Sequence, residues 1–325
     1  MRARSAGRRP ALLCLALLAA LLAFPVLPGP AAAAQDATPG TPAAQRRPAD
    51  DADLFAYDAA ADLGREEVGS ETRGGVTVRD IVYEGGNGPV EAYLVEPAGE
   101  GPFAATIFHH WFDPASPVNN RSQFLDEAVD LAGLGVVSLL VQGTFPWAED
   151  PEGAAHDRER VIAEVVELRR GLDLLLARDD IDPERVAFVG HDFGAMYGAI
   201  LAAVDTRVST AVLMAATPCW ADWYLPFWLE PALDADEEAG YRETLADVDP
   251  IAFVGEAAPA PLLFQFARED VYIPEATALA FYEAAGEGRR LELYDADHFL
   301  NDDARDARTF WLEVRLALGP GATGA

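Results

Sequence analysis

The feature that most constrains this chain is an alternation of short, continuously apolar segments with helical segments. Residues 104–109, 136–141 and 186–189 are apolar on both faces of a strand, whereas residues 157–177 place apolar side chains at helical spacing. Strands that are apolar on both faces belong to parallel sheets covered by helices on both sides. The pattern therefore predicts an α/β fold with a mostly parallel sheet. Further strands are expected at residues 210–214, 262–266 and 291–294, and further helices at 122–132, 195–204, 274–285 and 303–318.

Two segments depart from this alternation. Residues 76–83 and 90–95 alternate apolar and polar side chains around a glycine-rich turn, which predicts a hairpin. Residues 217–252 lie between two expected strands and are rich in aromatic side chains, which predicts a short cap insertion. These aromatic residues are Trp220, Trp223, Tyr224, Phe227, Trp228 and Tyr241.

The N-terminal part of the chain looks like an export signal followed by a linker. Residues 1–34 combine four arginines, an apolar stretch too short for a comfortable membrane span, and an alanine-rich cleavage site. An uncleaved anchor helix is the alternative. Residues 35–72 are predicted to be a disordered linker, and residues 73–320 are predicted to form the folded domain. We expect a secreted, periplasmic or cell-envelope protein with no stable membrane span after signal cleavage.

The charge balance excludes some classes of partner. The chain carries 54 acidic residues and a formal net charge of −30, and all of its basic residues are arginines. Such a surface repels nucleic acids and anionic membranes. We therefore expect a small-molecule substrate. An anionic substrate would need a binding site that is locally positive, unlike the rest of the surface.

A glycine-flanked turn follows the strand at residues 186–189. It runs from Gly190 to Gly194 with Asp192 in its centre, and a helix of small residues comes next. A strand–turn–helix of this kind lifts its central residue above the carboxyl edge of the sheet, where ligands bind. Asp192 is thus a candidate nucleophile. The alternative is an ordinary turn in which Asp192 caps the helix.

Gly190-His191-Asp192-Phe193-Gly194 resembles the nucleophile elbow of the α/β-hydrolase superfamily. In detail it looks like the branch with an aspartate nucleophile, which contains haloalkane dehalogenases and epoxide hydrolases. Over residues 75–318 the chain looks more like dienelactone-hydrolase-type proteins, although their elbows carry cysteine or serine. The segments that carry this second resemblance are residues 108–112, 124–141, 265–274 and 294–298.

The order of the candidate catalytic residues fits this fold. Nucleophile, acid and histidine follow one another along an α/β-hydrolase chain. Asp270 comes after the strand at 262–266 and suits the acid, with Glu269 as the alternative. His298 comes after the last strand and suits the base. A helix-capping aspartate and a surface histidine are the competing interpretations of these two residues.

A carboxylate nucleophile indicates a particular chemistry. Asp192 would attack an sp3 carbon and form an alkyl ester, and His298, oriented by Asp270, would then activate water against that ester. The backbone N–H groups of Phe193 and of Trp111, or of Phe112 in its place, would hold the oxyanion.

The cap insertion supplies candidate substrate-binding residues. Trp111 or a cap tryptophan could donate an indole N–H to a halide, and Tyr224 or Tyr241 could donate to an epoxide oxygen. Packing within the core or cap is the alternative for each. The substrate-binding residues that we predict are Trp220, Trp223, Tyr224 and Trp228.

No metal or organic cofactor is expected. His109, His110 and Asp113 form one short cluster, but a metal site needs three or four convergent ligands and no second cluster appears. The predicted function is a hydrolase acting on an epoxide or haloalkane. An ester or lactone hydrolase of the dienelactone-hydrolase type is the alternative, and a non-catalytic binding protein on the same scaffold is a further one.

Overall fold

The computed structural model describes residues 52–113, 115, 120–229, 232–257 and 259–319. Its strands are β1 Glu66–Arg73, β2 Val76–Glu84, β3 Pro89–Glu96, β4 Phe103–His109, β5 Val136–Val141, β6 Ile181–His191, β7 Thr210–Met214, β8 Leu262–Ala267 and β9 Arg290–Tyr294. Its α-helices are α2 Leu125–Ala132, α3 Ala154–Leu176, α4 Phe193–Val204, α5 Ala221–Tyr224, α6 Ala235–Leu245, α7 Pro250–Phe253, α8 Glu275–Ala284 and α9 Asp302–Arg315. Short 3₁₀ segments are η1 Ala52–Phe55, η2 Asn120–Ser122 and η4 Val254–Glu256, and η3 Leu225–Leu229 is a π-helix.

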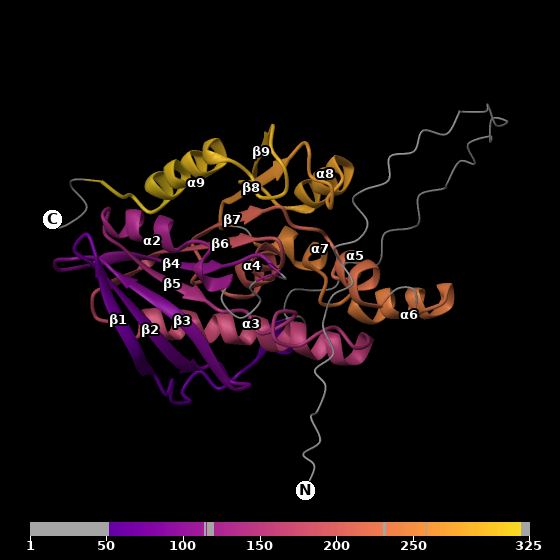
Figure 1. Ribbon diagram of the computed structural model, residues 1–325, viewed down its shortest axis with the longest axis horizontal. Helices are drawn as coiled ribbons and strands as arrows, with labels where there is room; N and C mark the ends of the chain where they lie inside the picture. The colour runs from indigo at the N-terminus through magenta and orange to yellow at the C-terminus, as the bar shows by residue number, and fades with distance from the viewer. Residues whose placement is uncertain (1–51, 114, 116–119, 230–231, 258, 320–325) are drawn as a thin grey trace, which may run out of the picture. The chain divides into compact units, whose positions relative to one another are not determined.

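The strands form one mixed sheet in the order β1-β2-β3-β5-β4-β6-β7-β8-β9 (Figure 1). The strands from β5 to β9 in this order pair in parallel, whereas β1, β2 and β3 pair antiparallel. The predicted, mostly parallel sheet is therefore confirmed, as is the predicted hairpin, which is β2 and β3. Since the carboxyl ends of parallel strands meet at one edge, the loops after β4, β6, β8 and β9 gather there.

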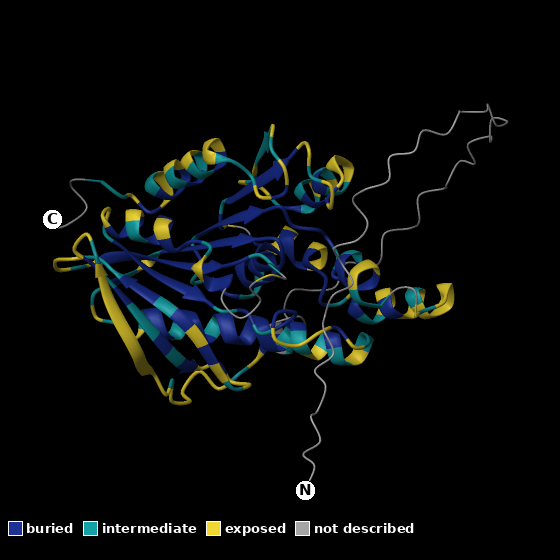
Figure 2. Ribbon diagram, viewed as in Figure 1, coloured by how far each residue is buried: buried dark blue, intermediate teal, exposed yellow. Residues whose placement is uncertain are grey.

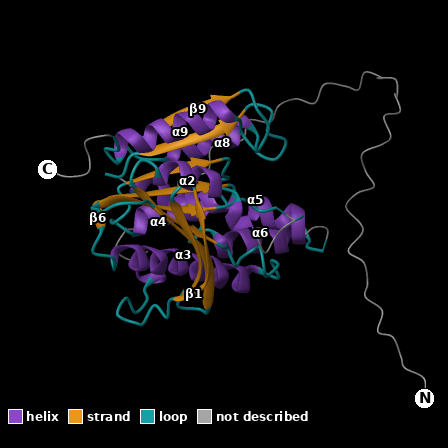
Figure 3. Cartoon of the chain, turned by 60° about the vertical axis from the view of Figure 1, so that its left-hand side comes forward, coloured by secondary structure: helices purple, strands orange, loops and turns teal. Residues whose placement is uncertain are grey.

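Helices cover both faces of this sheet (Figure 3). On one face, Phe108 and Val189 pack with side chains of α2 and α9. On the other face, Ile107 and Phe188 pack with side chains of α3 and α4. Because successive strand residues point to opposite faces, strands that are buried throughout become the centre of two cores (Figure 2). This explains why their sequences are continuously apolar.

The ordered structure begins earlier than the sequence predicts. The linker prediction covered residues 35–72, but η1 and most of β1 lie within that range. Phe55 is fully buried and its ring meets Phe253 at 5.6 Å, and Arg169 donates to the Phe55 carbonyl over 2.7 Å. The prediction is therefore wrong for residues 52–72, because one aromatic side chain and paired backbone are enough to anchor a polar segment.

Residues 1–34 lie outside the described residues, so export stays a prediction. No helix in the described part of the chain is long and apolar enough to span a membrane.

The predicted cap insertion lies between β7 and β8 and contains α5, η3, α6 and α7. Asp234 begins α6 with a capping box, in which its side chain accepts from the Glu237 N–H and Glu237 accepts from the Asp234 N–H. Tyr241 of α6 donates to Asp157 of α3 over 2.6 Å and so fixes α6 against the main domain. The insertion places α5 beside the carboxyl edge of the sheet (Figure 1).

Candidate active site

Asp192 occupies a strained turn between β6 and α4. Its φ is 58° and its ψ is −121°, a conformation that L-residues seldom adopt. The flanking glycines are required by close backbone contacts. A Cβ at Gly190 would lie 2.4 Å from the Gly194 carbonyl oxygen, and a Cβ at Gly194 would lie 2.1 Å from the His109 carbonyl oxygen. The predicted elbow is therefore present in the structure.

The two carboxylate oxygens of Asp192 have different surroundings. Oδ2 accepts a hydrogen bond from the Phe112 N–H over 3.2 Å. Oδ1 is buried and has no hydrogen-bond partner among the described residues. The side chain makes no capping hydrogen bond to α4, which argues against the alternative of a helix-capping aspartate. Burial raises the pKa of Asp192 to about 7, although His298 and the Phe112 and Phe193 N–H groups act to lower it.

Asp270 and His298 form a hydrogen-bonded pair. Asp270 lies in the loop after β8, and its Oδ2 is 2.8 Å from Nδ1 of His298, which follows β9. The other oxygen of Asp270 accepts from the N–H groups of Tyr272 and Ile273 at 2.8 and 3.0 Å. Burial works against the ionised form of Asp270, but these bonds and His298 outweigh it and lower the pKa of Asp270. The carboxylate is thus held ionised in a position that orients the imidazole.

His298 is coupled electrostatically to Asp192 as well. Burial disfavours the protonated imidazole, but the bond to Asp270 and the charge of Asp192 together raise the pKa of His298. The coupling is mutual, because His298 acts to lower the pKa of Asp192. The loops after β6, β8 and β9 therefore bring the three predicted catalytic residues into one buried cluster. Glu269, the alternative to Asp270, donates its N–H to the Ala296 carbonyl over 3.0 Å, whereas the carboxylate bonded to the imidazole is that of Asp270.

The donor predicted at Trp111 is wrong, because its N–H is engaged elsewhere. Trp111 donates its N–H to Oε1 of Gln123 over 2.8 Å, and its carbonyl accepts from the indole of Trp147. The next residue, Phe112, points its N–H at Asp192. The loop after β4 places successive N–H groups in different directions, and the sequence left both residues as candidates.

A hydrogen-bonded chain that the sequence did not predict links three loops of the site. Nε2 of Gln123 lies 2.7 Å from Nδ1 of His191, and Nε2 of His191 lies 2.9 Å from the His298 carbonyl oxygen. Gln123 also accepts from Trp111, so its amide nitrogen is the donor to His191. His191 then carries its proton on Nε2 and donates to His298. Burial lowers the pKa of His191 well below its usual range, which keeps the ring neutral.

The four cap aromatics predicted to bind substrate differ in their hydrogen bonds. Trp220 is fully buried and donates its indole N–H to the Val248 carbonyl over 2.7 Å, so it packs in the core and the prediction is wrong for it. Trp228 donates to Asp150 over 3.1 Å. The Tyr224 ring packs against Trp220 and Phe145 and stacks on Phe193 at 5.8 Å, and its hydroxyl group is buried without a hydrogen-bond partner among the described residues.

Trp223 contacts the ring of His298. Its indole N–H is buried without a partner in the described part of the chain, and its ring lies 5.9 Å from the ring of His298 and 5.5 Å from that of Phe193. It therefore combines an unused donor with ring contact to the candidate base.

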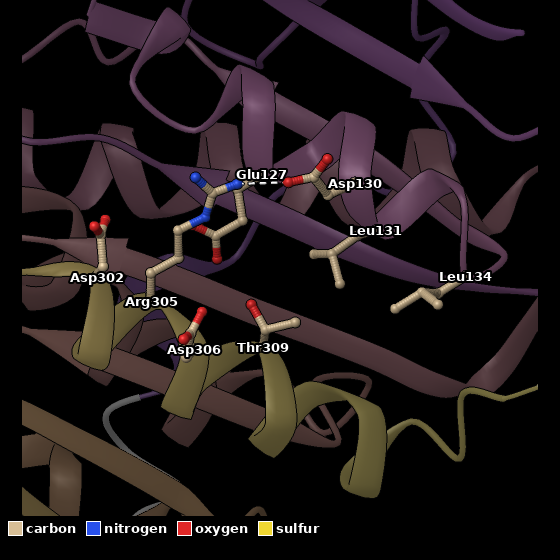
Figure 4. A pocket seen from close by; sticks show the side chains of 8 residues that line it. All are labelled: Glu127, Asp130, Leu131, Leu134, Asp302, Arg305, Asp306 and Thr309. Carbon is tan, nitrogen blue, oxygen red and sulfur yellow. Dashed lines mark hydrogen bonds and ion pairs between the residues drawn. The ribbon is translucent and has the colours of Figure 1, made fainter. Parts of the chain in front are cut away.

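Other regions that could hold a ligand lie apart from this cluster. The cavity in Figure 4 has a volume of about 500 Å³, lies between α2 and α9, and is lined mainly by charged residues such as Asp302, Arg305 and Asp306. None of the candidate catalytic residues lines it. Among the described residues no group of three or more histidine, cysteine or acidic side chains is arranged to hold a metal ion.

Comparison with known proteins identifies the fold. No family model matches the chain, and no curated protein sequence matches it. Among solved structures, the acetyl xylan esterase from Paenibacillus sp. R4 superposes with a TM-score of 0.64 at 19% identity, covering 82% of this chain and 93% of its own. Acetyl xylan esterase 1 from Thermoanaerobacterium sp. JW/SL YS485 gives 0.63 at 15% identity, covering 82% and 92%.

An alpha/beta hydrolase from Penicillium sp. sh18 gives a TM-score of 0.53 at 16% identity, covering 78% of this chain and all of its own. At these identities the likeness concerns the fold. The chain has the α/β-hydrolase fold.

Proposed function

We propose that this chain of the α/β-hydrolase fold is a hydrolase in which Asp192 attacks a small organic substrate of the epoxide or haloalkane type. The observation that carries the proposal is the unequal environment of the two Asp192 oxygens. Oδ2 faces the Phe112 N–H, whereas Oδ1 is buried and unpaired. An attacking carboxylate needs one free oxygen to form the new bond and one oxygen beside donors to carry charge later.

In the first step Oδ1 of Asp192 attacks an sp3 carbon of the substrate. The bond from that carbon to the halogen or epoxide oxygen breaks, and its electron pair leaves with the departing atom. The product is an alkyl ester of Asp192. Because the pKa of Asp192 is about 7, the carboxylate is mostly ionised above neutral pH and needs no base.

In the second step His298 removes a proton from a water molecule, whose oxygen attacks the carboxyl carbon of Asp192. Negative charge develops on Oδ2, beside the Phe112 N–H, and the Phe193 N–H also acts on the Asp192 carboxyl group. One such donor typically lowers the barrier by about 3 kcal/mol. The intermediate collapses, and the product alcohol takes the proton from His298. Asp192 is released as the acid and then loses its remaining proton to solvent, or to the alkoxide formed from an epoxide, which restores the carboxylate. Asp270 keeps the imidazole in the required tautomer throughout.

Trp223 supplies the donor for the leaving group in this proposal. A departing halide or alkoxide needs an N–H or O–H in an apolar setting, and the unpaired indole N–H of Trp223 lies in such a setting beside His298. An unpaired buried donor costs stability, so a ligand that accepts from it gains that energy on binding.

The second candidate is an ester or lactone hydrolase. Two observations favour it: the similar solved structures include acetyl xylan esterases, and a carboxyl pKa of about 7 suits a general base. Attack by Asp192 on an ester carbonyl would give an anhydride, so in this candidate Asp192 activates water instead. The new oxygen atom of the acid product would then come directly from water.

Isotope transfer separates the two candidates. Excess enzyme is mixed with a 1-bromoalkane, an epoxide or a p-nitrophenyl ester in water enriched in ¹⁸O for a single turnover. If Asp192 is the nucleophile, the first product carries ordinary oxygen and ¹⁸O appears in Asp192. If Asp192 is a general base, the product carries ¹⁸O and Asp192 does not. The His298→Ala variant should in addition accumulate the alkyl ester, detectable by mass spectrometry.

A matched control comes from a second buried carboxyl group. Burial also raises the pKa of Asp249 to about 7, and its carboxylate accepts from the Trp220 N–H outside the catalytic cluster. Asp249→Asn should keep turnover, whereas Asp192→Asn should lose it. If no substrate turns over and Asp192→Ala binds a ligand as well as the native chain does, the protein is a binding protein on a hydrolase scaffold.

A further inference from the structure

Exposed hydrophobic side chains are concentrated beside the catalytic cluster. Among the described residues nine large hydrophobic side chains are exposed, and five of them lie in the cap insertion or in the loops that carry Asp270 and His298. The fifth, Ile251, lies at the far end of the insertion on α7. We call the other four the apolar rim; they are Phe227, Val271, Tyr272 and Phe299, exposed by 54%, 85%, 47% and 57%. An exposed apolar cluster of this kind marks a binding surface more often than a scattered single residue does.

The apolar rim is continuous with the catalytic histidine. The rings of Phe227 and Tyr272 lie 6.1 Å apart, and Tyr272 lies 5.1 Å from His298. The ring of Phe299 lies 6.3 Å from that of His298 and contacts Trp111 at 4.7 Å. A ligand that reaches Asp192 past His298 therefore meets aromatic surface beside the imidazole.

The surroundings of the rim are acidic. Asp295 and Asp297 lie in the loop before His298, and the side chain of Asp295 is 89% exposed. Arg268, near Asp270, is paired with Asp295 at 3.2 Å and with Glu275 at 3.8 Å. The charge of Asp270 acts on Asp192 as well, and it raises the pKa of Asp192. Arg268 is thus neutralised by carboxylates, and the acidic side chains of this loop would repel an anionic substrate.

We propose that the apolar rim holds a hydrophobic arm of the substrate outside the buried site, and that the substrate is neutral. The inference rests on the proposed function for the reacting end of the substrate, and it adds the substrate class: an uncharged compound with an apolar chain or ring system longer than the buried site. Continuity of the rim with His298 identifies the occupant as the substrate itself.

Binding of product-like alcohols tests the rim without any turnover. We expect the native chain to bind 1-octanol at least about tenfold more tightly than 1-butanol in calorimetric titrations, because the extra methylene groups leave water. The double variant Phe227→Ser/Phe299→Ser should lose most of that difference while its affinity for 1-butanol stays the same. Phe310→Ser on α9, whose side chain is 62% exposed, is the matched control and should change neither affinity.

Charge is tested at constant chain length. Octanoate should bind at least about tenfold more weakly than 1-octanol at pH 8, and added salt should narrow the difference. Equal affinity for octanoate and octanol would overturn the neutral-substrate part of the proposal.

Two further outcomes would overturn the proposal that the apolar rim binds the substrate. One is an equal loss of affinity for butanol and octanol in the double variant, which would mean damage to the buried site. The other is a native dimer that becomes monomeric in the double variant by sedimentation, which would mean that a second copy covers the rim. If alcohols bind as expected but bromoalkanes, epoxides and esters are all inert, the proposed function fails and the rim stands.

Discussion

The imidazole of His191 donates a hydrogen bond over 2.9 Å to the backbone carbonyl of His298, which joins the residue before the candidate nucleophile to the candidate base. His191 is fully buried, and its other nitrogen accepts from Gln123. Gln123 also accepts a hydrogen bond from the Trp111 N–H. The hydrogen bonds of Gln123 and His191 therefore fix the positions of the loops after β4, β6 and β9 relative to one another. A buried and fully bonded network of this kind fixes a single arrangement.

Replacing His191 should slow the step that depends on His298. We expect His191→Leu to lower the rate of hydrolysis of the covalent intermediate about tenfold, since roughly 1.4 kcal/mol of positioning energy is lost. The rate of intermediate formation should stay nearly the same. Rapid-quench measurement of both phases gives the comparison. His191→Gln, which can still donate to the His298 carbonyl, should recover part of the loss, and an equal slowing of both phases would argue for general disruption.

The two neighbouring tryptophans of the cap insertion should respond in opposite ways to loss of the indole N–H. Trp223→Phe removes an unpaired donor, so stability should hold while kcat/KM falls by roughly tenfold or more. Trp220→Phe breaks the bond to Val248, so stability should fall by about 1–2 kcal/mol with little effect on kcat/KM. Urea unfolding and steady-state kinetics on both variants provide the test. A stable Trp223→Phe with native kinetics would remove Trp223 from the site.

Periodicity was sufficient for the fold because the central strands are buried on both faces. A short, continuously apolar segment such as 136–141 fits a strand buried on both faces of a sheet, and β5 has the predicted bounds. The same reasoning failed at residues 52–72, where β1 is exposed along most of its length and has no apolar pattern to detect. Its order comes from pairing with β2, and backbone pairing leaves no signature in the side chains.

Within the site, the sequence indicated which residues take part better than it indicated where their backbone N–H groups and side chains point. Asp270 and His298 were predicted from their positions after strands, and they are hydrogen-bonded in the structure. The choice between Trp111 and Phe112 depends on which N–H faces Asp192, and backbone direction in a loop is not encoded by residue type. The role of Gln123 was missed for the same reason, because a single polar residue before a helix has no distinguishing pattern.

Stability of the Asp192→Asn variant should depend on pH in a defined direction. A buried carboxyl group whose folded-state pKa is raised from 3.8 to about 7 imposes no penalty below pH 4, where it is protonated in both states. The penalty grows between pH 4 and 7 and is constant above. Asp192→Asn removes it, so the variant should be more stable than the native chain at pH 8, by on the order of 4 kcal/mol. Urea unfolding at pH 4, 6 and 8 measures the difference, and an equal gain at all three values would contradict the assigned cause.

The same ionisation should control the reaction rate. Asp192 must be ionised to attack, so kcat/KM should rise about tenfold per pH unit up to roughly pH 7 and then level off. The pKa of Asp270 is lowered, so Asp270 stays ionised across this range and adds no second limb. A pH–rate profile between pH 5 and 9 provides the test. A rate that stays flat down to pH 5 would mean that Asp192 is not the group that must lose a proton.

Formation of the ester intermediate should itself prepare His298 to act as a base. In the free protein the charge of Asp192 helps to raise the pKa of His298, and that charge disappears when Asp192 is esterified. The imidazole then loses its proton more readily, at the moment when it has to accept one from water. Asp192→Asn mimics the uncharged ester, so the pKa of His298, followed by NMR of the ring C–H protons, should be lower in this variant than in the native chain. Asp249→Asn should leave it unchanged, and an unaltered His298 titration in Asp192→Asn would show that the two residues are not coupled in this way.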